Sequence, residues 1–470
     1  MVALVCAVLA GCGAAARLTR PEGDGGWTPE QRRDEVARAA TVAEPSPAGP
    51  LTLASALAIA ERGNRRIAEA EEGLEAARGR VWQSRAALLP STTGAGRYTW
   101  YSDPLTTNVV LTPGLLPAGV TTPVVVVRES KVGNVGGLLT VPVDVSGELR
   151  HALAAVQAGY RGERARVWAT RLEQQLAVTR SYFELLAAKR LLDVNTQTIA
   201  LQRDQLAIAR ARFDSGRVTR NEVLVVEVAL RNAEQNRLTA ELGIDRARWA
   251  LNDAIGVAVD APSEVVDVQA RPAVPTPDEA LDLARANNPV LVSLVEEQQR
   301  LDETVESLER GWLPRVAGGG TIDYNTQTIL QPQRIGSGFV GFTWDLGTDG
   351  RRAGEIAEAA AGARRARLAL EDQLRGLEAA VRHLQRATTE RLAALDAAEA
   401  SVLQAEENLR IRREQFSAGR ATSDDVLDAD NLLTRERATL AVALYQAHTR
   451  RAELQELIGL PLDALVQAQE

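Results

Sequence analysis

Two long stretches of the chain place apolar residues at helical spacing. In the second stretch these residues fall three, four or seven positions apart, which keeps them on one side of an α-helix. Alanine fills several positions of this seam, so neighbouring helices can approach closely. The positions that define it are Leu374, Leu377, Val381, Leu384, Leu395, Ala398, Val402, Ala405 and Leu409. The pattern predicts long helices packed side by side.

Proline placement sets the length of these helices. The chain contains 19 prolines, yet none lies from Val143 to Ala261 or from Gln333 to Leu460. Proline cannot continue the hydrogen-bond ladder of a helix, so each of these stretches can hold an uninterrupted helix and its return. A helix from about Glu148 to Phe213 is on the order of 100 Å long at ~1.5 Å per residue. Such a length suits a structure that bridges a gap rather than a globular core.

Four short segments alternate apolar and polar residues with a period of two. An apolar face opposite a polar face is typical of a barrel wall between lipid and water, and equally of a half-buried sheet in a soluble protein. We favour the barrel wall, because the flanking helices offer no globular core for such a sheet to cover. The four apolar sets are Gly96, Tyr98 and Trp100; Leu139, Val141, Val143 and Val145; Val316, Ile322 and Tyr324; and Val340, Phe342, Trp344 and Leu346.

Four strands are too few to close a barrel, since the smallest membrane-spanning form has about eight. Open sheet edges in lipid would leave backbone groups without hydrogen-bond partners. The strands therefore predict an oligomer that closes the wall, and the alternation alone permits two, three or four copies.

One segment of the chain occurs twice. The sequence ARFDSGRVTRNEVLVVE, which begins at Ala211, recurs 203 residues later as EQFSAGRATSDDVLDAD. Gly216 and Gly419 suit the left-handed position that ends a helix, and Thr219 and Thr422 suit the N-cap of the next helix. Each segment therefore predicts the tip of a helical hairpin, and the chain contains two long hairpins.

The openings of the two halves also match, LTLASALAIAERGNRRI with PTPDEALDLARANNPVL, at an offset of 224. The same offset relates Leu89-Pro90 to Leu313-Pro314, where proline stops a single opening helix in each half. The expected organisation is residues 1–11 as a signal peptide, 12–50 as a lipidated linker, 51–256 as the first repeat, 257–274 as a linker, 275–460 as the second repeat and 461–470 as a C-terminal tail.

Composition narrows the class of protein. The net charge is −8, with 54 basic and 62 acidic residues, so the totals give no basic character for nucleic acid. Cys6 and Cys12 are the only cysteines, which leaves the body of the chain without a thiolate nucleophile or a cysteine-based metal site. His151, His383 and His448 lie far apart, and we interpret them as solvated helix residues. Without a clustered catalytic set or a phosphate-binding loop, we predict no enzyme, no cofactor and no metal.

The N-terminus begins with the apolar run MVALVCAVLAGCGAAA. It is too short for a permanent membrane helix and suits the apolar part of a signal peptide. The ending Leu9-Ala10-Gly11-Cys12 resembles a bacterial lipoprotein processing box, in which Cys12 becomes the lipidated first residue of the mature chain. No Lys or Arg precedes the run, which points to a start further upstream. The alternative is an ordinary cleaved signal peptide in which Cys12 has no role.

Over roughly 51–460 the chain resembles the TolC family of outer-membrane efflux proteins. The resemblance is carried by the openings AERGNRRIA and LARANNPVL, the turns VDVSGE and WDLGTDGRR, and the tips FDSGRVTRNEVL and FSAGRATSDDVL. It implies a mainly α fold with membrane β, as a homotrimer. Four strands from each chain form one twelve-stranded β-barrel in the outer membrane, and the duplicated helical hairpins form an α-barrel tunnel in the periplasm. It also implies a periplasmic adaptor (membrane fusion protein) and an inner-membrane pump as partners.

The resemblance further implies a periplasmic gate. The string Asp425-Val426-Leu427-Asp428 matches the Asp-Val-Leu-Asp that narrows the entrance in this family. A spacing of three places both carboxylates on one helix face, and three chains would form an acidic ring that attracts cations and obstructs anions. The first repeat retains one acid here, Glu222. The alternative is that these are solvated acids near a helix start, where the helix dipole favours negative charge.

The hairpin tips, Gly216-Arg217 and Gly419-Arg420, are expected to face the adaptor. Without a partner they would be ordinary helix turns. The favoured function is therefore a passive duct from the periplasm to the outside, as part of a tripartite efflux or type I secretion system. The alternative is a lipid-anchored periplasmic coiled-coil scaffold or adaptor without a pore. Two hairpins and four amphipathic strands disfavour it, because adaptors carry one hairpin joined to compact β domains.

Overall fold

The computed structural model describes residues 49–108, 124–268, 270–327, 332–346 and 349–462. The expected signal peptide, the expected lipidation site at Cys12 and the end of the chain from 463 onward lie outside these ranges. No helix within the described ranges is both long enough and apolar enough to cross a membrane.

Each half of the chain opens with two helices rather than one. These are α3 (Leu53–Gly63) and α4 (Arg65–Ala86) in the first half, and α7 (Pro277–Asn287) and α8 (Pro289–Arg310) in the second. The prediction of a single opening helix is wrong, because Asn64 and Asn288 adopt an extended backbone and interrupt it. Each asparagine side chain instead accepts hydrogen bonds from the first turn of the following helix.

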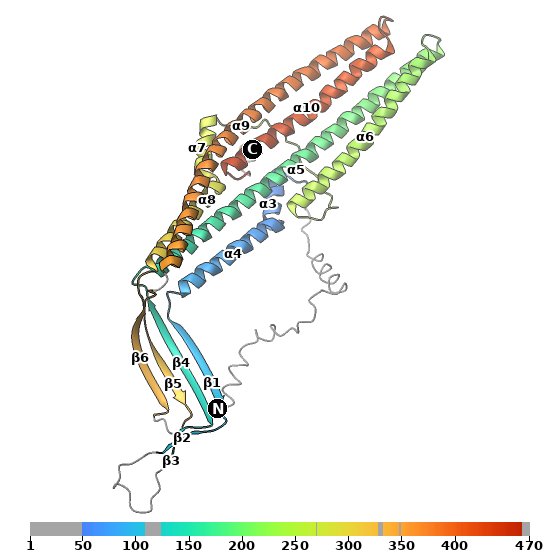
Figure 1. Cartoon of the computed structure of the whole chain (residues 1–470). Coiled ribbons are helices and arrows are strands. Elements are labelled where there is room, and N and C mark those ends of the chain that lie inside the picture. The colour runs from blue at the N-terminus through green and yellow to red at the C-terminus, as the bar shows by residue number, and fades with distance from the viewer. Residues whose placement is uncertain (1–48, 109–123, 269, 328–331, 347–348, 463–470) are drawn as a thin grey trace, which may run out of the picture. The chain divides into compact units, whose positions relative to one another are not determined.

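Two long helical hairpins follow, as the proline-free stretches predict. The first consists of α5 (Glu148–Asp214) and α6 (Arg220–Ile255), and the second of α9 (Asp349–Ser417) and α10 (Ser423–Ile458). The 67 residues of α5 correspond to about 100 Å. Figure 1 shows the hairpins side by side, with α5 packed against α10. Most of the predicted seam is buried, including Leu377, Val381, Leu395, Ala398, Ala405 and Leu409.

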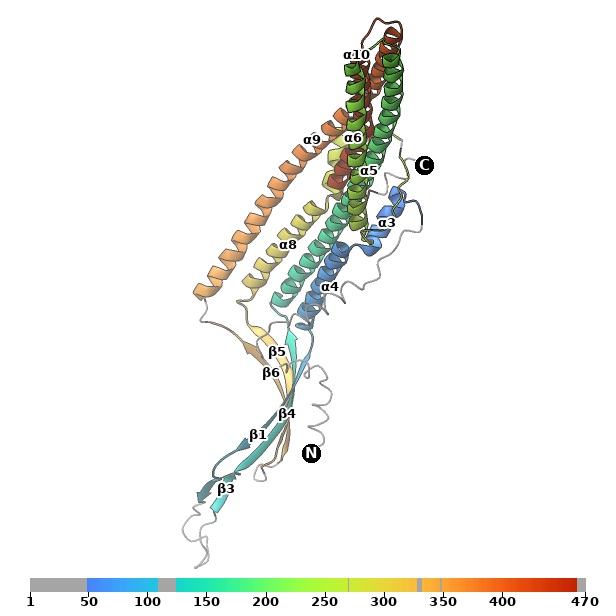
Figure 2. The ribbon, with the colours of Figure 1, turned by 90° about the vertical axis from the view of Figure 1, so that its right-hand side faces the viewer.

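The half of the helices next to the strands forms a single curved layer. Its order is α9, α8, α5 and α4, as Figure 2 shows, and each neighbouring pair is in contact. The opening helices therefore extend the layer that the long helices begin, and all four helices in it connect directly to strands.

The four predicted strands form one antiparallel sheet with the order β1-β4-β5-β6. Their bounds are β1 Ser91–Trp100, β4 Lys131–Val143, β5 Arg315–Asn325 and β6 Arg334–Thr343. The sequence pattern missed a second, two-stranded ribbon of β2 (Leu105–Asn108) and β3 (Val124–Arg128), which continues from β1 and leads into β4. β2 is only four residues long, too short for a clear alternation.

Two closing turns, one in each half, fix the end of a hairpin to the opening helices. Gly256 caps the C-terminal end of α6 and Gly459 that of α10, with φ angles of 76° and 88°. A Cβ on Gly256 would lie 2.8 Å from the carbonyl oxygen of Gly63, and one on Gly459 would lie 2.3 Å from that of Asn287. Both positions therefore need glycine for its left-handed backbone and for the close approach of a second backbone.

The asparagine caps complete these turns. The side-chain amide of Asn64 donates to the carbonyl oxygen of Ala254 at 3.2 Å. The amide of Asn288 donates to that of Leu457 at 2.8 Å. Each asparagine is thus buried between the end of one helix and the start of another. The duplication seen in the sequence is therefore also a duplication of specific hydrogen bonds.

The segment between the repeats, 257–274 with residue 269 outside the described ranges, forms a strap across both hairpins. On α5, the hydroxyl of Tyr182 donates to the carbonyl oxygen of Val266 at 2.5 Å. On α10, the hydroxyl of Tyr445 donates to the carboxylate of Asp267 at 2.6 Å. Burial raises the pKa of both phenols, that of Tyr445 to about 12, so both remain protonated donors at neutral pH.

The far end of the strap reaches α9. Arg271 pairs with Asp396 at 2.6 Å and with Glu399 at 2.7 Å. Between these contacts the ring of His448 on α10 donates to the carbonyl oxygen of Ala270 at 2.8 Å. Nearer its start, the side-chain amide of Asn252 on α6 donates to the carbonyl oxygens of Val259 and Ala261, so the strap contacts all four long helices.

The expectation of three solvated histidines is wrong for His448, of which only 2% is exposed. Its ring stacks on Phe183 with the centroids 4.7 Å apart, and burial lowers its pKa. His151 is half-buried, with Nδ1 lying 2.7 Å from Glu303. His383 is exposed as expected. The strap explains the difference, because it covers the side of α10 that carries His448.

Candidate channel entrance and membrane-facing sheet

Both hairpin tips end their first helix in the same way. Gly216 and Gly419 have φ angles of 74° and 72°, which confirms the predicted left-handed positions. The N–H groups of Arg217 and Arg420 each donate to the carbonyl oxygen five residues earlier, at 2.9 and 2.8 Å. This hydrogen bond closes the last turn of each helix. Both arginines are exposed at the tips.

The two tips differ in how the returning helix begins. Thr219 and Thr422 occupy the predicted N-cap positions, but only Thr422 makes a capping hydrogen bond. Its hydroxyl accepts from the N–H of Asp425 at 3.2 Å, and the Asp425 carboxylate accepts from the N–H of Thr422 at 2.8 Å. This reciprocal capping box lowers the pKa of Asp425, mainly through the backbone hydrogen bond from Thr422. Asp425 therefore stabilises the start of its own helix.

The three acids predicted to form a gate have unequal surroundings. Glu222 accepts a hydrogen bond from the hydroxyl of Ser423 at 3.0 Å, which joins the two hairpins. Asp425 is engaged by its cap and lies 4.0 Å from Arg412. Asp428 is exposed, and its carboxylate forms no hydrogen bond or ion pair with another described residue. Of the three, Asp428 offers the freest negative charge.

Sequence reasoning passed over one acid close to this string. Asp430 on α10 is 1% exposed and accepts a hydrogen bond at 2.6 Å from the side chain of Gln202 on α5. The spacing of its apolar neighbours in the sequence could have identified Asp430. Val426, Asp430 and Leu433 are spaced by four and three residues, so Asp430 occupies a core position of the helix.

The register of the sheet places the four predicted apolar sets on one face. Residues directly opposite each other on neighbouring antiparallel strands point to the same side. The pairs that fix this are Tyr98–Gly133 between β1 and β4, Val135–Tyr324 between β4 and β5, and Val316–Phe342 between β5 and β6. No helix covers this face within the described residues: Val340 is 84% exposed, Ile322 72% and Phe342 71%.

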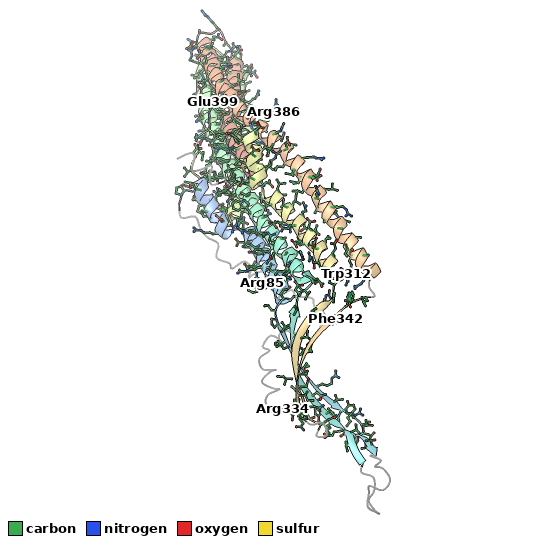
Figure 3. The ribbon with its side chains drawn as sticks, turned by 90° about the vertical axis from the view of Figure 1, so that its left-hand side faces the viewer. Arg85, Trp312, Arg334, Phe342, Arg386 and Glu399 are labelled. Carbon is green, nitrogen blue, oxygen red and sulfur yellow. The ribbon has the colours of Figure 1, made fainter. Side chains whose placement is uncertain are left out.

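Aromatic side chains gather at both ends of the apolar face. Phe342 and Trp344 lie at the end next to the helices, where the indole N–H of Trp344 donates to the carbonyl oxygen of Trp312 at 2.9 Å. Tyr98 and Trp100 lie at the other end and pack edge to face, with ring centroids 6.2 Å apart. Figure 3 shows Trp312 and Phe342 at the junction of helices and strands.

The spacing between these aromatic ends matches a bilayer. Through the register, Tyr98 is level with Gly133 and Phe342 with Val143, ten residues apart on β4. Ten residues extend about 33 Å along a strand, or about 25 Å across the membrane at the ~40° tilt of barrel strands. An apolar band of about 25 Å between two aromatic girdles is the pattern of a lipid-facing barrel surface.

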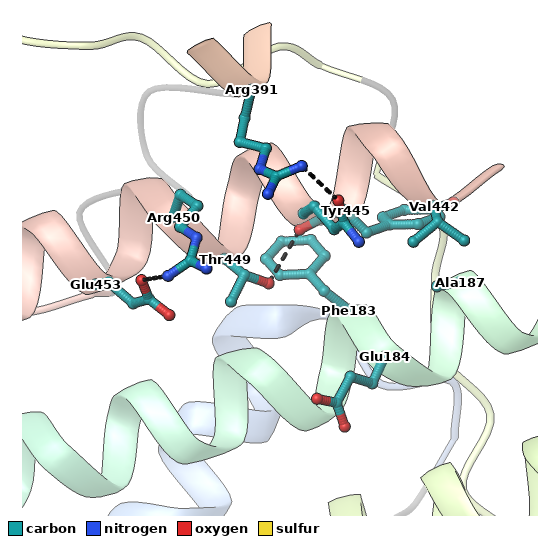
Figure 4. A pocket seen from close by; sticks show the side chains of 10 residues that line it. Phe183, Glu184, Ala187, Arg391, Val442, Tyr445, Thr449, Arg450 and Glu453 are labelled. Carbon is teal, nitrogen blue, oxygen red and sulfur yellow. Dashed lines mark hydrogen bonds and ion pairs between the residues drawn. The ribbon is translucent and has the colours of Figure 1, made fainter. Parts of the chain in front are cut away.

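A hollow of about 270 Å³ opens at the seam between α5 and α10, where Phe183 and Tyr445 supply ring surface (Figure 4). Its charged groups are Glu184, Glu453, Arg391 and Arg450, of which Arg450 and Glu453 pair at 2.6 Å. These four charges balance, so the charged groups that line the hollow sum to zero. Nowhere in the described ranges do three or more His, Cys, Asp or Glu side chains gather so as to hold a metal ion.

Solved structures of other proteins share this fold, and three of them illustrate it. VceC from Vibrio cholerae is 18% identical with a TM-score of 0.73, covering 87% of this chain and 96% of that one. The CmeC outer membrane channel of Campylobacter jejuni is 15% identical with a TM-score of 0.72, covering 87% and 85%. The open state of the MtrE outer membrane channel of Neisseria gonorrhoeae is 17% identical with a TM-score of 0.70, covering 87% and 89%. The fold is therefore that of an outer-membrane channel protomer.

A family model described as "Outer membrane efflux protein" matches residues 56–257 and 280–460. These segments make up most of the chain, so this protein belongs to the outer membrane efflux protein family. No curated protein matches its sequence. The resemblance to TolC-type proteins and the predicted fold class, outer-membrane location and efflux-channel function are confirmed. The proteins that it matches are channels rather than enzymes.

Proposed function

We propose that three copies of this chain form a passive duct that leads from the periplasm to the outside. The observation that carries the proposal is the uncovered apolar face of the four-stranded sheet, together with its two free edges. In the described sheet, β1 and β6 each pair with one strand only. Backbone groups at such edges need partners within a bilayer, and neighbouring copies can supply them. Three copies give twelve strands, within the range of closed barrels.

The hairpins extend the duct into the periplasm. Each begins at the sheet and returns at an exposed tip, so three copies would supply six hairpins to a helical tunnel. The exposed arginines Arg217 and Arg420 are the surface that we assign to the periplasmic adaptor. The duct itself performs no reaction, and an inner-membrane pump joined through that adaptor drives the cargo.

Anchoring by lipid at Cys12 is part of the same proposal, resting on the Leu-Ala-Gly-Cys sequence. The competing function, a periplasmic scaffold without a pore, leaves the apolar sheet face without a use. A soluble scaffold would cover large apolar side chains such as Phe342 and Trp100, which are more than 70% exposed.

The first test is the mass of the detergent-purified protein, by native mass spectrometry, followed by conductance in planar bilayers. We expect a trimer, extracted only from outer membranes, that forms stable pores without added nucleotide. A monomer or dimer in the soluble periplasmic fraction would overturn the duct and favour the scaffold.

The unequal surroundings of the acids at the second tip predict unequal effects on ion selectivity. Asp428→Asn removes a free charge and is expected to lower the cation preference of the pore without loosening the tip. Asp425→Asn is expected to loosen the start of α10, because an amide replaces the carboxylate of the capping box. The measurements are the reversal potential in a KCl gradient and hydrogen exchange at the tip.

The same pair of variants distinguishes an acidic gate from the alternative, in which these acids are only solvated residues at a helix start. Unchanged reversal potentials in both would show that these acids cap and solvate the helix start but do not face the permeating ions. The pKa of Asp425 is lowered, so its capping contribution is complete above the ordinary aspartate pKa and is lost as pH falls through the folded value. Selectivity is therefore best compared at neutral pH.

A further inference from the structure

The seam between the hairpins contains a fully buried carboxyl group opposite a fully buried amide. Asp430 on α10 and Gln202 on α5 are 1% and 2% exposed. Gln202 lies twelve residues before the end of α5 at Asp214, about 18 Å from the first tip. The amide Nε2 donates to Oδ2 of Asp430 at 2.6 Å, so this contact joins the first hairpin to the second.

One oxygen on each side chain remains without a partner. Oδ1 of Asp430 and Oε1 of Gln202 are both buried, and neither makes a hydrogen bond with any described residue. Both are acceptors if Asp430 is ionised, so neither can satisfy the other. A proton on Oδ1 supplies the missing donor, because a carboxylic acid and a carboxamide that face each other form two antiparallel hydrogen bonds. One added proton thus gives the two orphaned oxygens a donor and an acceptor.

Nearby charges oppose this protonation but do not dominate it. Burial favours the neutral form and raises the pKa of Asp430 overall, whereas Arg413 on α9, the hydrogen bond from Gln202 and Arg437 on α10 favour the ionised acid. Arg437 is already paired with Glu406 at 2.7 Å. The charged neighbour of Gln202 on α5, Arg203, pairs with Glu234 of α6 at 3.6 Å.

We propose that Asp430 carries a proton in the folded chain and that the Asp430–Gln202 pair is a proton-dependent clasp between the two hairpins. Loss of the proton to solvent leaves a buried carboxylate beside the amide oxygen. This weakens the contact between α10 and α5 near the tips. The effect on conduction rests on the proposed function, whereas the protonation and its effect on the seam do not.

The direction of the pH dependence follows from the raised pKa. Between the ordinary aspartate pKa and the folded value, the folded chain binds more protons than the unfolded chain. The stabilisation by the clasp is therefore complete at low pH and is lost as pH rises through the folded value. Across that window, the equilibrium that opens the seam shifts toward the open form by up to tenfold per pH unit in each protomer.

The direct test is infrared spectroscopy of the full-length detergent-solubilised protein at neutral pH. We expect a protonated-carboxyl band that Asp430→Asn removes and that the exposed control Asp428→Asn retains. All samples also carry Glu456→Gln and are called the background protein before any further substitution. This removes the Glu456 carboxyl from the band, because burial also raises the pKa of Glu456. An identical band in Asp430→Asn and its background would overturn the proposal. If Asp430→Asn fails to fold, the test is the same comparison with Gln202→Leu, in which the band is expected to shift.

The functional consequence is read from hydrogen exchange at 198–206 and 426–434 between pH 6 and pH 9. Protection of the background protein is expected to fall by up to tenfold per pH unit until the pH reaches the folded pKa of Asp430 and to stay level above it, whereas Asp430→Asn, which keeps a neutral two-bond pair, stays level throughout. Parallel pH profiles in both proteins would overturn the clasp. If the exchange difference is present but no pores form at any pH, the proposed duct is overturned and the proposed clasp is retained.

Discussion

Gly459→Ala is expected to abolish assembly of the folded protein. A non-glycine residue at a φ of 88° costs about 1–2 kcal/mol, and the added Cβ would meet the Asn287 carbonyl oxygen at 2.3 Å. Backbone must move to relieve that contact, which raises the total to about 3 kcal/mol or more per chain. The measurement is the yield of trimer after detergent extraction, together with its thermal unfolding midpoint.

The matched control is Gly419→Ala at the second tip. Its φ of 72° gives a similar backbone cost, but a Cβ there has nothing within 4 Å. The control is therefore expected to lose only about 1–2 kcal/mol and to assemble. Equal losses from the two substitutions would mean that the close approach at the closing turn does not matter to stability. Gly256→Ala is expected to behave like Gly459→Ala, because it closes the first half in the same way.

Ile322→Arg is expected to prevent insertion into the outer membrane. Ile322 is 72% exposed on the apolar face and is paired with Gly137, midway between the two aromatic ends. An arginine on the lipid face near the middle of a bilayer costs about 2–4 kcal/mol. In the proposed trimer this cost arises three times in one barrel, so the variant is expected to accumulate outside the membrane fraction.

The control Thr93→Arg places the same charge at the same level on the opposite face. Thr93 pairs with Leu138, next to Gly137 in β4, but lies on the side that we assign to the water-filled interior. This variant is expected to insert normally and to change only conductance. Both variants would be compared by membrane fractionation and heat-resistant trimer on gels. Normal insertion of Ile322→Arg would contradict the assignment of the lipid-facing side.

The features predicted best from sequence depend on neighbouring residues in the chain. The long helices follow from the absence of proline and from apolar spacing, and the tip glycines from the local need for a left-handed residue. The faces of the strands were also predictable, because alternation is a local pattern. Their register was not, since it depends on pairing between β4 and β5, almost 200 residues apart.

The features that the sequence did not reveal depend on contacts between distant segments. The burial of His448 comes from the strap, and no helical pattern shows which side of α10 a linker will cover. Asp430 lies two residues after the acidic string in the sequence, but its burial depends on Gln202 from the other hairpin. The break at Asn64 was also missed, although the matching Asn288-Pro289 carries the sequence signal of a new helix start.

The part of α10 between the strap and the second tip forms an arm that can pivot at the strap. α10 is held at Tyr445 by Asp267, and it continues without a break from there back to its first residue, Ser423. These 22 residues form an arm about 33 Å long, at ~1.5 Å per residue. A rotation of about 10° at the strap would displace the tip by about 6 Å, so in the proposed trimer a small angular change would alter the width of the entrance. In the proposed trimer, three such α10 arms, pivoting about three straps, would widen or narrow the entrance while the sheet stays still.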